Sequence, residues 1–454
     1  MKDWVDYLRL LPEVKKPEKK LDFNEKLKWT LIVLVLFFFL SVVPLYGLSS
    51  NYVSQLQDLS LILAAKIGSL ISLGIGPIVS GSIILQLLKG ADVIKLDTNS
   101  KEGKEKYQLI QKGISVLFII VMNAMYVFSG AIPPSSATLF NQLIMILQLI
   151  FGGLLLMLFD EICSKWGFGS GISLFIAAGV SQQLFIKALS LVRDPSSGFF
   201  TGYIPLIFQS LLSGNFGLMI WPLISVVATI AVFLLIVFAS SIKVNIPLTL
   251  GRVRGYNIKW PIKFFYTSNI PVIFAASLIA MVQMLGLMLF NAGFPILGTF
   301  SGQSAQTGIA SWLVFPSLRT IITNGLGSYV PQLIFYPLFM IVGCVLFSIL
   351  WVQVGGQDAA SVADQIHESG LSIPGFRRDK RILERVVKRY IDPLTVLGAI
   401  AVALLAVVAE LFSALTSGTG LLLSVMIIYG FYENIKREGM QGANSTVKKL
   451  LEAV

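Results

Sequence analysis

Residues 73–88 read LGIGPIVSGSIILQLL and combine two features that rarely occur together. The composition is apolar enough for a membrane-spanning helix, yet the stretch opens with Gly-x-Gly-Pro, a pattern that interrupts helices. Just before it, residues 55–66 read QLQDLSLILAAK, an apolar segment too short to cross a bilayer. The chain thus places a half-length apolar segment against the interrupted start of a longer apolar run.

The composition of the whole chain is typical of a polytopic membrane protein. Hydrophobic residues make up 55% of its 454 residues and charged residues 13%, whereas soluble domains average about 25% charged residues. A helix needs about 20 apolar residues to cross the hydrocarbon core. Such runs predict ten spanning helices, near residues 28–47, 73–90, 110–132, 138–161, 170–191, 219–242, 265–290, 331–353, 391–413 and 418–435.

The basic residues orient these spans. If the ten helices are numbered in order, 31 of the 35 Lys and Arg residues fall on one side of the membrane. Lys and Arg are enriched in cytoplasmic segments of membrane proteins. The other side has only Lys66, Lys187, Arg193 and Arg319. We therefore predict that both termini are cytoplasmic.

The chain divides into an amino-terminal segment and two halves. Trp4, Tyr7, Leu8 and Leu11 recur at helical spacing, so residues 1–24 are predicted to form an amphipathic helix at the cytosolic membrane interface. A soluble cap packed on the bundle is the alternative. Five spans per half, in residues 25–217 and 218–454, would make the second half inverted relative to the first.

The sequence offers little for catalysis or ion coupling. His367 is the single histidine, so an H-E-x-x-H zinc site cannot form within this chain. It lies in a predicted cytosolic connection, which disfavours an intramembrane Ser–His pair. Gly167, Gly169 and Gly171 lack the Lys-Ser/Thr of a phosphate-binding loop. The acidic residues of the spans lie near their edges, as Asp160 and Glu410 do. We therefore expect no enzyme activity, no cofactor and no metal.

Five motifs together resemble one family. They are the stretch at 73–88, DEICSKWGFGSGISLFIAAGV at 160–180, KWPIKFFYTSNIPVI at 259–273, IPGFRRDK at 373–380 and GTGLLLSVMIIY at 418–429. The chain resembles the SecY family, the large subunit of the protein-conducting channel, and is most similar to its archaeal branch. The resemblance implies an all-α polytopic membrane protein of ten transmembrane helices. These would form two inverted halves around a central hourglass pore, with a short external plug helix.

The resemblance also implies the parts of a pore. Six apolar side chains would form a constriction, here called the collar: Ile75, Val79, Ile172, Ile176, Ile273 and Leu423. An apolar ring offers ions no replacement for their hydration shell. Residues 55–67 would be the plug, with Leu56, Leu59, Ile62 and Leu63 as its apolar positions. The glycines before the second span would let that plug move.

A lateral gate is implied between spans two and three on one side and spans seven and eight on the other. Its candidate polar residues are Ser80, Gln86, Asn123 and Gln283. Hydrophobic segments would pass through this gate into lipid. Ordinary interhelical hydrogen bonds are the alternative for each polar residue.

Two basic cytosolic loops, 243–264 and 354–389, complete the implied machinery. Their candidate ribosome-binding residues are Arg252, Arg254, Lys259, Arg377, Arg378 and Arg381. Basic loops suit the phosphates of ribosomal RNA, although orientation in the membrane alone accounts for part of the charge. The implied partners are the small membrane subunits SecE and Sec-beta, the ribosome, signal sequences, nascent polypeptides and lipid.

The function implied is therefore a passive channel for unfolded secretory chains in the cell membrane. It would also release hydrophobic segments sideways into lipid. A ten-helix secondary carrier of a small neutral solute is the alternative. An intramembrane enzyme is disfavoured because the chain has no histidine pair.

Overall fold

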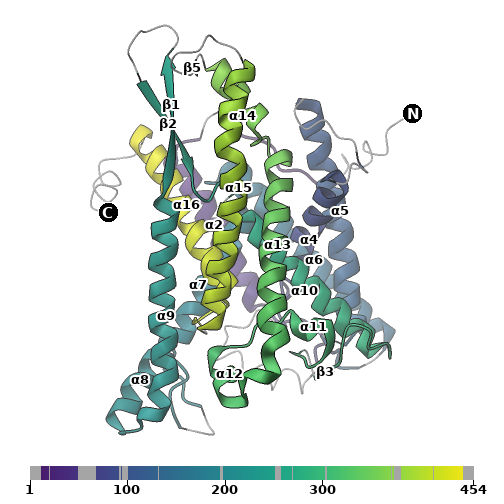
Figure 1. The fold of residues 1–454 in the computed structure, drawn as a ribbon. Coiled ribbons are helices and arrows are strands. Elements are labelled where there is room, and N and C mark those ends of the chain that lie inside the picture. Colours follow the sequence, from purple (N-terminus) through teal and green to yellow (C-terminus); the bar gives the residue numbers. More distant parts are fainter. Residues whose placement is uncertain are drawn as a thin grey trace.

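The computed structural model describes residues 12–19, 21–49, 68–90, 94, 101–130, 132–136, 138–194, 198–250, 257–267, 269–301, 304–369, 371–372, 380–412 and 414–442. Residues 1–11 of the amphipathic helix predicted over residues 1–24 lie outside these ranges, and the described residues 12–19, 21 and 22 are not helical. The predicted plug residues Leu56, Leu59, Ile62 and Leu63 also lie outside the described ranges. The described chain is mainly a bundle of long helices (Figure 1).

Every predicted span overlaps a described helix. The first five are α2 (Phe23–Val42), α4 (Gly76–Gly90), α5 (Lys101–Phe128), α6 (Leu139–Trp166) and α7 (Gly171–Leu189). The second five are α9 (Phe216–Ser241), α10 (Ile270–Asn291), α13 (Val330–Val354), α15 (Lys380–Leu411) and α16 (Gly418–Gly442). Within the described residues, seven helices are long and apolar enough to cross a membrane by length and composition, and α2, α4 and α16 are not among them. The count of ten crossings therefore stays a prediction.

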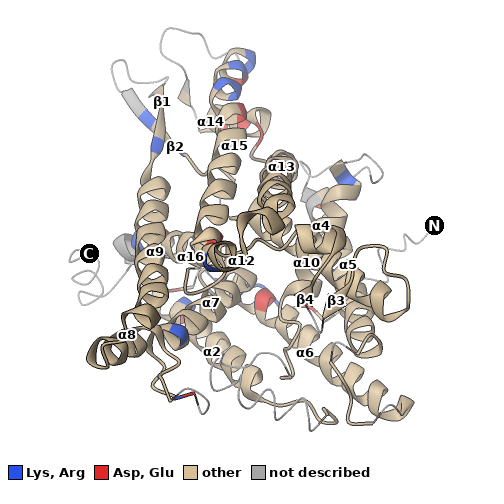
Figure 2. Cartoon of the chain, turned by 60° about the horizontal axis from the view of Figure 1, so that its bottom comes forward, with Lys and Arg blue, Asp and Glu red and all other residues tan. Residues whose placement is uncertain are grey.

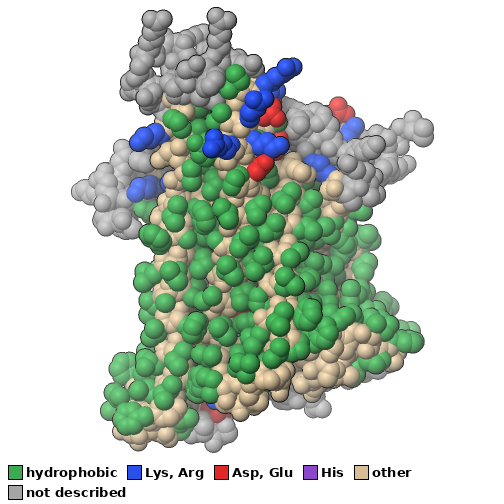
Figure 3. Space-filling view, viewed as in Figure 1, with side chains coloured by type: hydrophobic (Ala, Val, Ile, Leu, Met, Phe, Trp, Pro, Cys, Tyr) green, Lys and Arg blue, Asp and Glu red, His purple; other side chains and the backbone are tan. Residues whose placement is uncertain are grey.

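The surface of the bundle separates apolar and charged side chains. A belt of hydrophobic side chains covers the long helices, and Lys and Arg gather at one end of the face in view (Figure 3). This end also has the hairpin of β1 (Lys243–Leu250) and β2 (Asn257–Lys263), and α14 (Ala359–Glu368) (Figure 1). We call it the basic end. Such a belt matches the hydrocarbon layer of a bilayer, where exposed apolar side chains are stable.

One apolar cluster fills the centre of the bundle, and α4, α7, α9, α10, α13, α15 and α16 contribute to it. On α15, Ala399, Ala403 and Ala406 are all 2% exposed or less. Their spacing of three or four residues places these small side chains on one face of the helix. Small side chains let neighbouring helices approach closely, so α15 can pack tightly against α13 and α16.

A small β-sheet at the basic end differs from the all-helical prediction. β1 (Lys243–Leu250) pairs antiparallel with β2 (Asn257–Lys263) and with β5 (Leu371–Ser372). In β1, Val244, Ile246 and Leu248 alternate with other residues, which is the period of a strand with one buried face. Ile246 and Leu248 are fully buried against residues of α14 and α15. The sheet thereby joins the two basic loops that the sequence analysis treated separately.

Short elements cover the opposite end. They are α8 (Tyr203–Leu212), α12 (Leu318–Asn324), η1 (Leu326–Tyr329), α11 (Gly308–Trp312) and the paired strands β3 (Phe300–Ser301) and β4 (Ser304–Ala305). Figure 2, turned to bring this end forward, shows α8, α12 and the β3–β4 pair around the helix ends.

Candidate functional site

The six predicted collar residues belong to one apolar cluster. Val79 on α4, Ile273 on α10 and Leu423 on α16 are buried members, at 3%, 8% and 6% exposed. Ile75, Ile172 and Ile176 are half-buried and pack against the same cluster, and Ile75 and Ile172 also contact a second cluster that includes Val33. Four separate helical regions therefore bring their aliphatic side chains into a common core.

Aliphatic side chains determine what such a cluster can do. They carry no donor, acceptor or charge, so the collar has nothing with which to coordinate an ion or a polar solute. An ion would have to lose its hydration shell without compensation. Branched aliphatic side chains also change rotamer without breaking any hydrogen bond, so the same ring can yield to a passing chain.

A series of tight turns leads into α4. Gly74 has φ +54°, a left-handed conformation that favours glycine. Its N–H donates to the carbonyl of Ile71, and the N–H of Gly76 donates to that of Leu73. Pro77 then occupies the second position of α4, where proline is tolerated because it lacks an N–H. The Gly-x-Gly-Pro pattern is thus a connection that turns the chain directly into α4.

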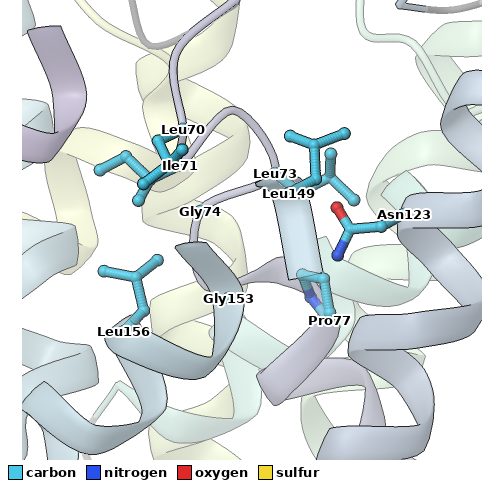
Figure 4. Close-up of a pocket in the computed structure, with 9 residues that line it drawn as sticks. All are labelled: Leu70, Ile71, Leu73, Gly74, Pro77, Asn123, Leu149, Gly153 and Leu156. Carbon is cyan, nitrogen blue, oxygen red and sulfur yellow. The ribbon is translucent and has the colours of Figure 1, made fainter. Parts of the chain in front are cut away.

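A small pocket adjoins these turns. It is lined from the turns and from α4, α5 and α6, by Leu70, Ile71, Leu73, Gly74, Pro77, Asn123, Leu149, Gly153 and Leu156 (Figure 4). Asn123 is 1% exposed, and its amide nitrogen donates to the carbonyl of Ile119 in its own helix. Asn123, a predicted gate residue, therefore faces a pocket beside α6. No residue of α10 or α13, the helices on the other side of the predicted gate, lines this pocket.

The other three predicted gate residues lie on α4 and α10. Ser80 and Gln86 are buried on α4, at 1% and 2% exposed. Gln283 on α10 is half-buried, and its amide donates to the carbonyl of Leu313 at 3.4 Å. No described hydrogen bond joins any of the four to another, so the structure does not gather them into one polar cluster.

The seam between α4–α5 and α10–α13 is closed at two points that the sequence did not indicate. At one, the Asn291 amide at the end of α10 donates to the carbonyl of Ser129, just after α5, at 2.6 Å. At the other, Leu350 of α13 packs so closely on Gly90 of α4 that a Cβ there would lie 2.3 Å from it. These residues, with no family motif to mark them, add to the contacts of α4 with α10 and α13 across the seam.

Side chains tie the β1–β2 hairpin to α16. Lys243 and Lys263 lie directly opposite each other where the hairpin begins and ends. Glu433 of α16 forms salt bridges with both lysines, and its distance to Lys243 Nζ is 3.3 Å. One carboxylate therefore offsets the repulsion between two facing lysines.

Two of the predicted ribosome-binding residues are described. Lys259 on β2 and Arg381 at the start of α15 are exposed at the basic end. Arg252, Arg254, Arg377 and Arg378 lie outside the described residues. Because β5 pairs with β1, residues 371–372 of the second loop lie against the first loop's hairpin.

Fold and site together define a class: a polytopic helical membrane protein whose helices bring six aliphatic side chains into or against one apolar cluster. A family model described as SecY matches residues 69–432, and one described as the plug domain of Sec61p matches residues 35–68. The chain belongs to the SecY family. This confirms the resemblance, and it leaves the alternative of a small-solute carrier without support.

Archaeal relatives and solved structures agree with this assignment. The chain is 42% identical to protein translocase subunit SecY of Methanothermobacter thermautotrophicus, covering 97% of each chain. It is 41% identical to that of Methanocaldococcus jannaschii, covering 99% of this chain and all of the relative. A solved structure described as that of a protein conducting channel matches with a TM-score of 0.82 and 40% identity, over 96% of this chain and 97% of that one. Sec61 in a canine ribosome–channel complex matches with a TM-score of 0.79 and 40% identity, over the same shares.

Proposed function

We propose that this chain is the channel subunit through which unfolded secretory polypeptides cross the membrane, and that the collar is its ion seal. One observation carries the proposal: of six aliphatic residues distant in sequence, three are buried members of one apolar cluster of the bundle and the other three pack against it. Selection is by exclusion, because the collar has no group that could recognise a particular substrate sequence.

The seam between α4–α5 and α10–α13 is the proposed exit into lipid. A hydrogen bond within each side of the seam joins α4 to α5 and α10 to α13, so that each pair can move as a unit. On one side, the Gln111 amide of α5 donates to the Ser82 hydroxyl of α4 at 2.8 Å. On the other, Thr267 and Ser348 link the start of α10 to α13 through hydroxyls 2.8 Å apart. Separating these units breaks the contacts at Gly90 and Asn291, and a segment of about 20 apolar residues then gains by entering lipid.

The chain is proposed to act without catalysis, so a partner supplies the driving force. The ribosome is the proposed cytosolic partner at the basic end, since a related channel is described in a ribosome–channel complex. Two small subunits, SecE and Sec-beta, are proposed to pack against the bundle. We place both termini and the basic end in the cytoplasm and the chain in the cell membrane, following the distribution of Lys and Arg.

Site-specific cross-linking tests the proposal. A photoreactive residue replaces Ile273 in the collar or, as a matched control, Val33, which is 1% exposed and belongs to another apolar cluster. Reconstituted protein is given a secretory chain arrested during translocation. We expect the arrested chain to cross-link to position 273 and not to position 33. Equal labelling at both positions, or none at 273 while the chain is protected from protease, would refute the proposed path.

A further inference from the structure

Two acidic residues, one near the end of α6 and one near the end of α15, bind the starts of the next helices in the same way. Asp160 Oδ1 accepts a hydrogen bond from the backbone N–H of Ile172 at 2.8 Å. The Glu410 carboxylate accepts from the backbone N–H of Gly418. In both cases the donor is one of the first two residues of the following helix, Ile172 in α7 and Gly418 in α16.

The serine before each helix repeats the match. Ser170 Oγ accepts from the N–H of Ser173 at 3.5 Å, and Ser417 Oγ accepts from that of Gly420 at 3.2 Å. Each donor lies three residues after its serine. The acid, the serine and the glycine that follows it therefore form one arrangement that occurs twice.

The glycines Gly171 and Gly418 allow the close approach that this arrangement needs. A Cβ on Gly171 would lie 2.5 Å from Asp160 Cα, and one on Gly418 would lie 2.4 Å from the Glu410 nitrogen. These neighbours are backbone atoms, which cannot move aside as a flexible side chain can. α7 therefore begins in direct contact with α6, and α16 begins in direct contact with α15.

The repeat also aligns two collar residues. Ile176 and Leu423 each lie six residues after the capping serine, about 9 Å along the helix. The next residue in each helix is Ala177 or Ser424, and these two meet: Ser424 Oγ donates to the carbonyl of Ala177 at 3.4 Å. A contact between a residue and its own counterpart is what a two-fold axis produces. Ile176 and Leu423 therefore flank such an axis.

We propose that Asp160 and Glu410 are a symmetry-related pair of positioning residues for the collar. Each carboxylate fixes the height and rotation of one pore helix by binding an N–H group that has no partner inside the helix. The helix dipole favours negative charge at the same place. The inference rests on the proposed function of the collar, and it gives a role to acids that lie near the edges of the predicted spans.

The test uses full-length protein reconstituted in vesicles. Asp160→Ala and Glu410→Ala remove the carboxylates, whereas Asp160→Asn and Glu410→Gln keep one carbonyl oxygen as acceptor. The matched control is Glu161→Gln, since Glu161 contacts Lys112 and Lys165 and not α7. All variants are made in a chain whose buried Cys163 and Cys344 are replaced by Ala. The relative position of α7 and α16 is measured by the rate of disulfide formation between Ala177→Cys and Ser424→Cys. The second readout is ion leak.

Both Ala variants are expected to slow the cross-link and raise the leak several-fold, the Asn and Gln variants less, and Glu161→Gln not at all. Folded Ala variants with parental cross-linking and leak would overturn the inference. If the Ala variants do not fold, parental cross-linking in the Asn and Gln variants would overturn it. A variant with Ile75, Ile172 and Ile273 changed to Gly separates the two proposals. If only the triple Gly variant leaks, the positioning role is refuted. If the Asp160 and Glu410 variants cross-link slowly but the triple Gly variant does not leak, the collar is refuted as the seal.

Discussion

A single glycine fixes where the turns before α4 lie. A Cβ on Gly152 of α6 would lie 2.1 Å from the carbonyl oxygen of Leu70 and 2.9 Å from its carbonyl carbon. Both are backbone atoms, so no side-chain rotation can relieve the clash. The absence of a side chain at position 152 thus sets the distance between α6 and the segment that leads from the predicted plug to α4.

At this residue scale we predict that Gly152→Ala destabilises the protein. The added methyl group displaces residue 70 or α6, at a cost of about 1–3 kcal/mol for an overpacked site. Thermal unfolding in detergent measures the effect. Gly217→Ala is the control, because a Cβ there meets no heavy atom within 4 Å. Equal unfolding midpoints for the two variants would contradict the prediction.

The sequence motifs pointed to aliphatic residues that lie in or against one cluster, but the direction of single polar side chains could not be predicted. Family motifs mark Ile75, Ile273 and Leu423 directly. The placement of Asn123 toward α6 depends on how α5 is rotated against its neighbours, and the spacing of residues along one helix does not determine that rotation. The contacts of Asn291 and Gly90 could not be predicted for the same reason, because their partners Ser129 and Leu350 are distant in sequence.

At the scale of elements, the segment at residues 12–19 is held to the ends of α5 and α6. Lys165 Nζ donates to Glu13 Oε1 at 2.7 Å, and Lys112 Nζ donates to the carbonyl of Pro12 at 2.6 Å. Trp166 Nε1 donates to the carbonyl of Lys15 at 2.9 Å. We call residues 12–19 the strap. It joins the amino-terminal region to the bundle largely through lysines.

Lys165 makes part of this attachment sensitive to pH. Its hydrogen bond and positive charge lower the pKa of Glu13 below the usual value of 4.5. Because the pKa is lower in the folded state, the contact contributes stability above the unfolded value. That contribution is lost as the pH falls through the folded value.

We therefore predict that acid releases the strap through Glu13. A spin label at Lys16→Cys, an exposed position, should become more mobile as the pH falls from 7 to below 4.5. In Glu13→Gln the label should be more mobile than in the parent at pH 7 and show a much smaller transition, while the bonds to the Pro12 and Lys15 carbonyls remain. Glu18→Gln, at an exposed acid in the same segment, should behave as the parent. An unchanged transition in Glu13→Gln would count against this account.

Helices were more predictable than strands. The thickness of a bilayer demands long apolar runs, so each predicted span overlaps a helix. The alternation of Val244, Ile246 and Leu248 in β1 was a readable strand signal, but it sits in a basic loop. The partner β5 has only two residues, Leu371 and Ser372, and pairing across that sequence separation leaves no local pattern.

At the scale of the whole molecule, positive charge and hydrophobic surface occupy separate regions. The predicted division of Lys and Arg agrees with their gathering at one end of the face shown in Figure 3. The sheet places the two basic loops together at that end. A ribosome bound there would contact both loops at once, and the charge of each would contribute to phosphate binding.

We predict that charge reversal at the basic end weakens ribosome binding. Lys259→Glu and Arg377→Glu should each reduce affinity and lower the slope of log affinity against log salt by about one. Binding assays over a series of salt concentrations measure both. Arg319→Glu, at an exposed position of α12 at the opposite end, should bind as the parent does. Loss of affinity in all three variants would show that net charge alone matters.

The most direct test of the central claim is the ion conductance of vesicles whose protein carries Ile75→Gly, Ile172→Gly and Ile273→Gly. These changes remove aliphatic side chains from the collar and leave the described hydrogen bonds and salt bridges of the bundle in place. We predict a large leak of small ions relative to parent vesicles with equal amounts of folded protein. Conductance equal to that of the parent would contradict the claim that this apolar cluster seals the pore.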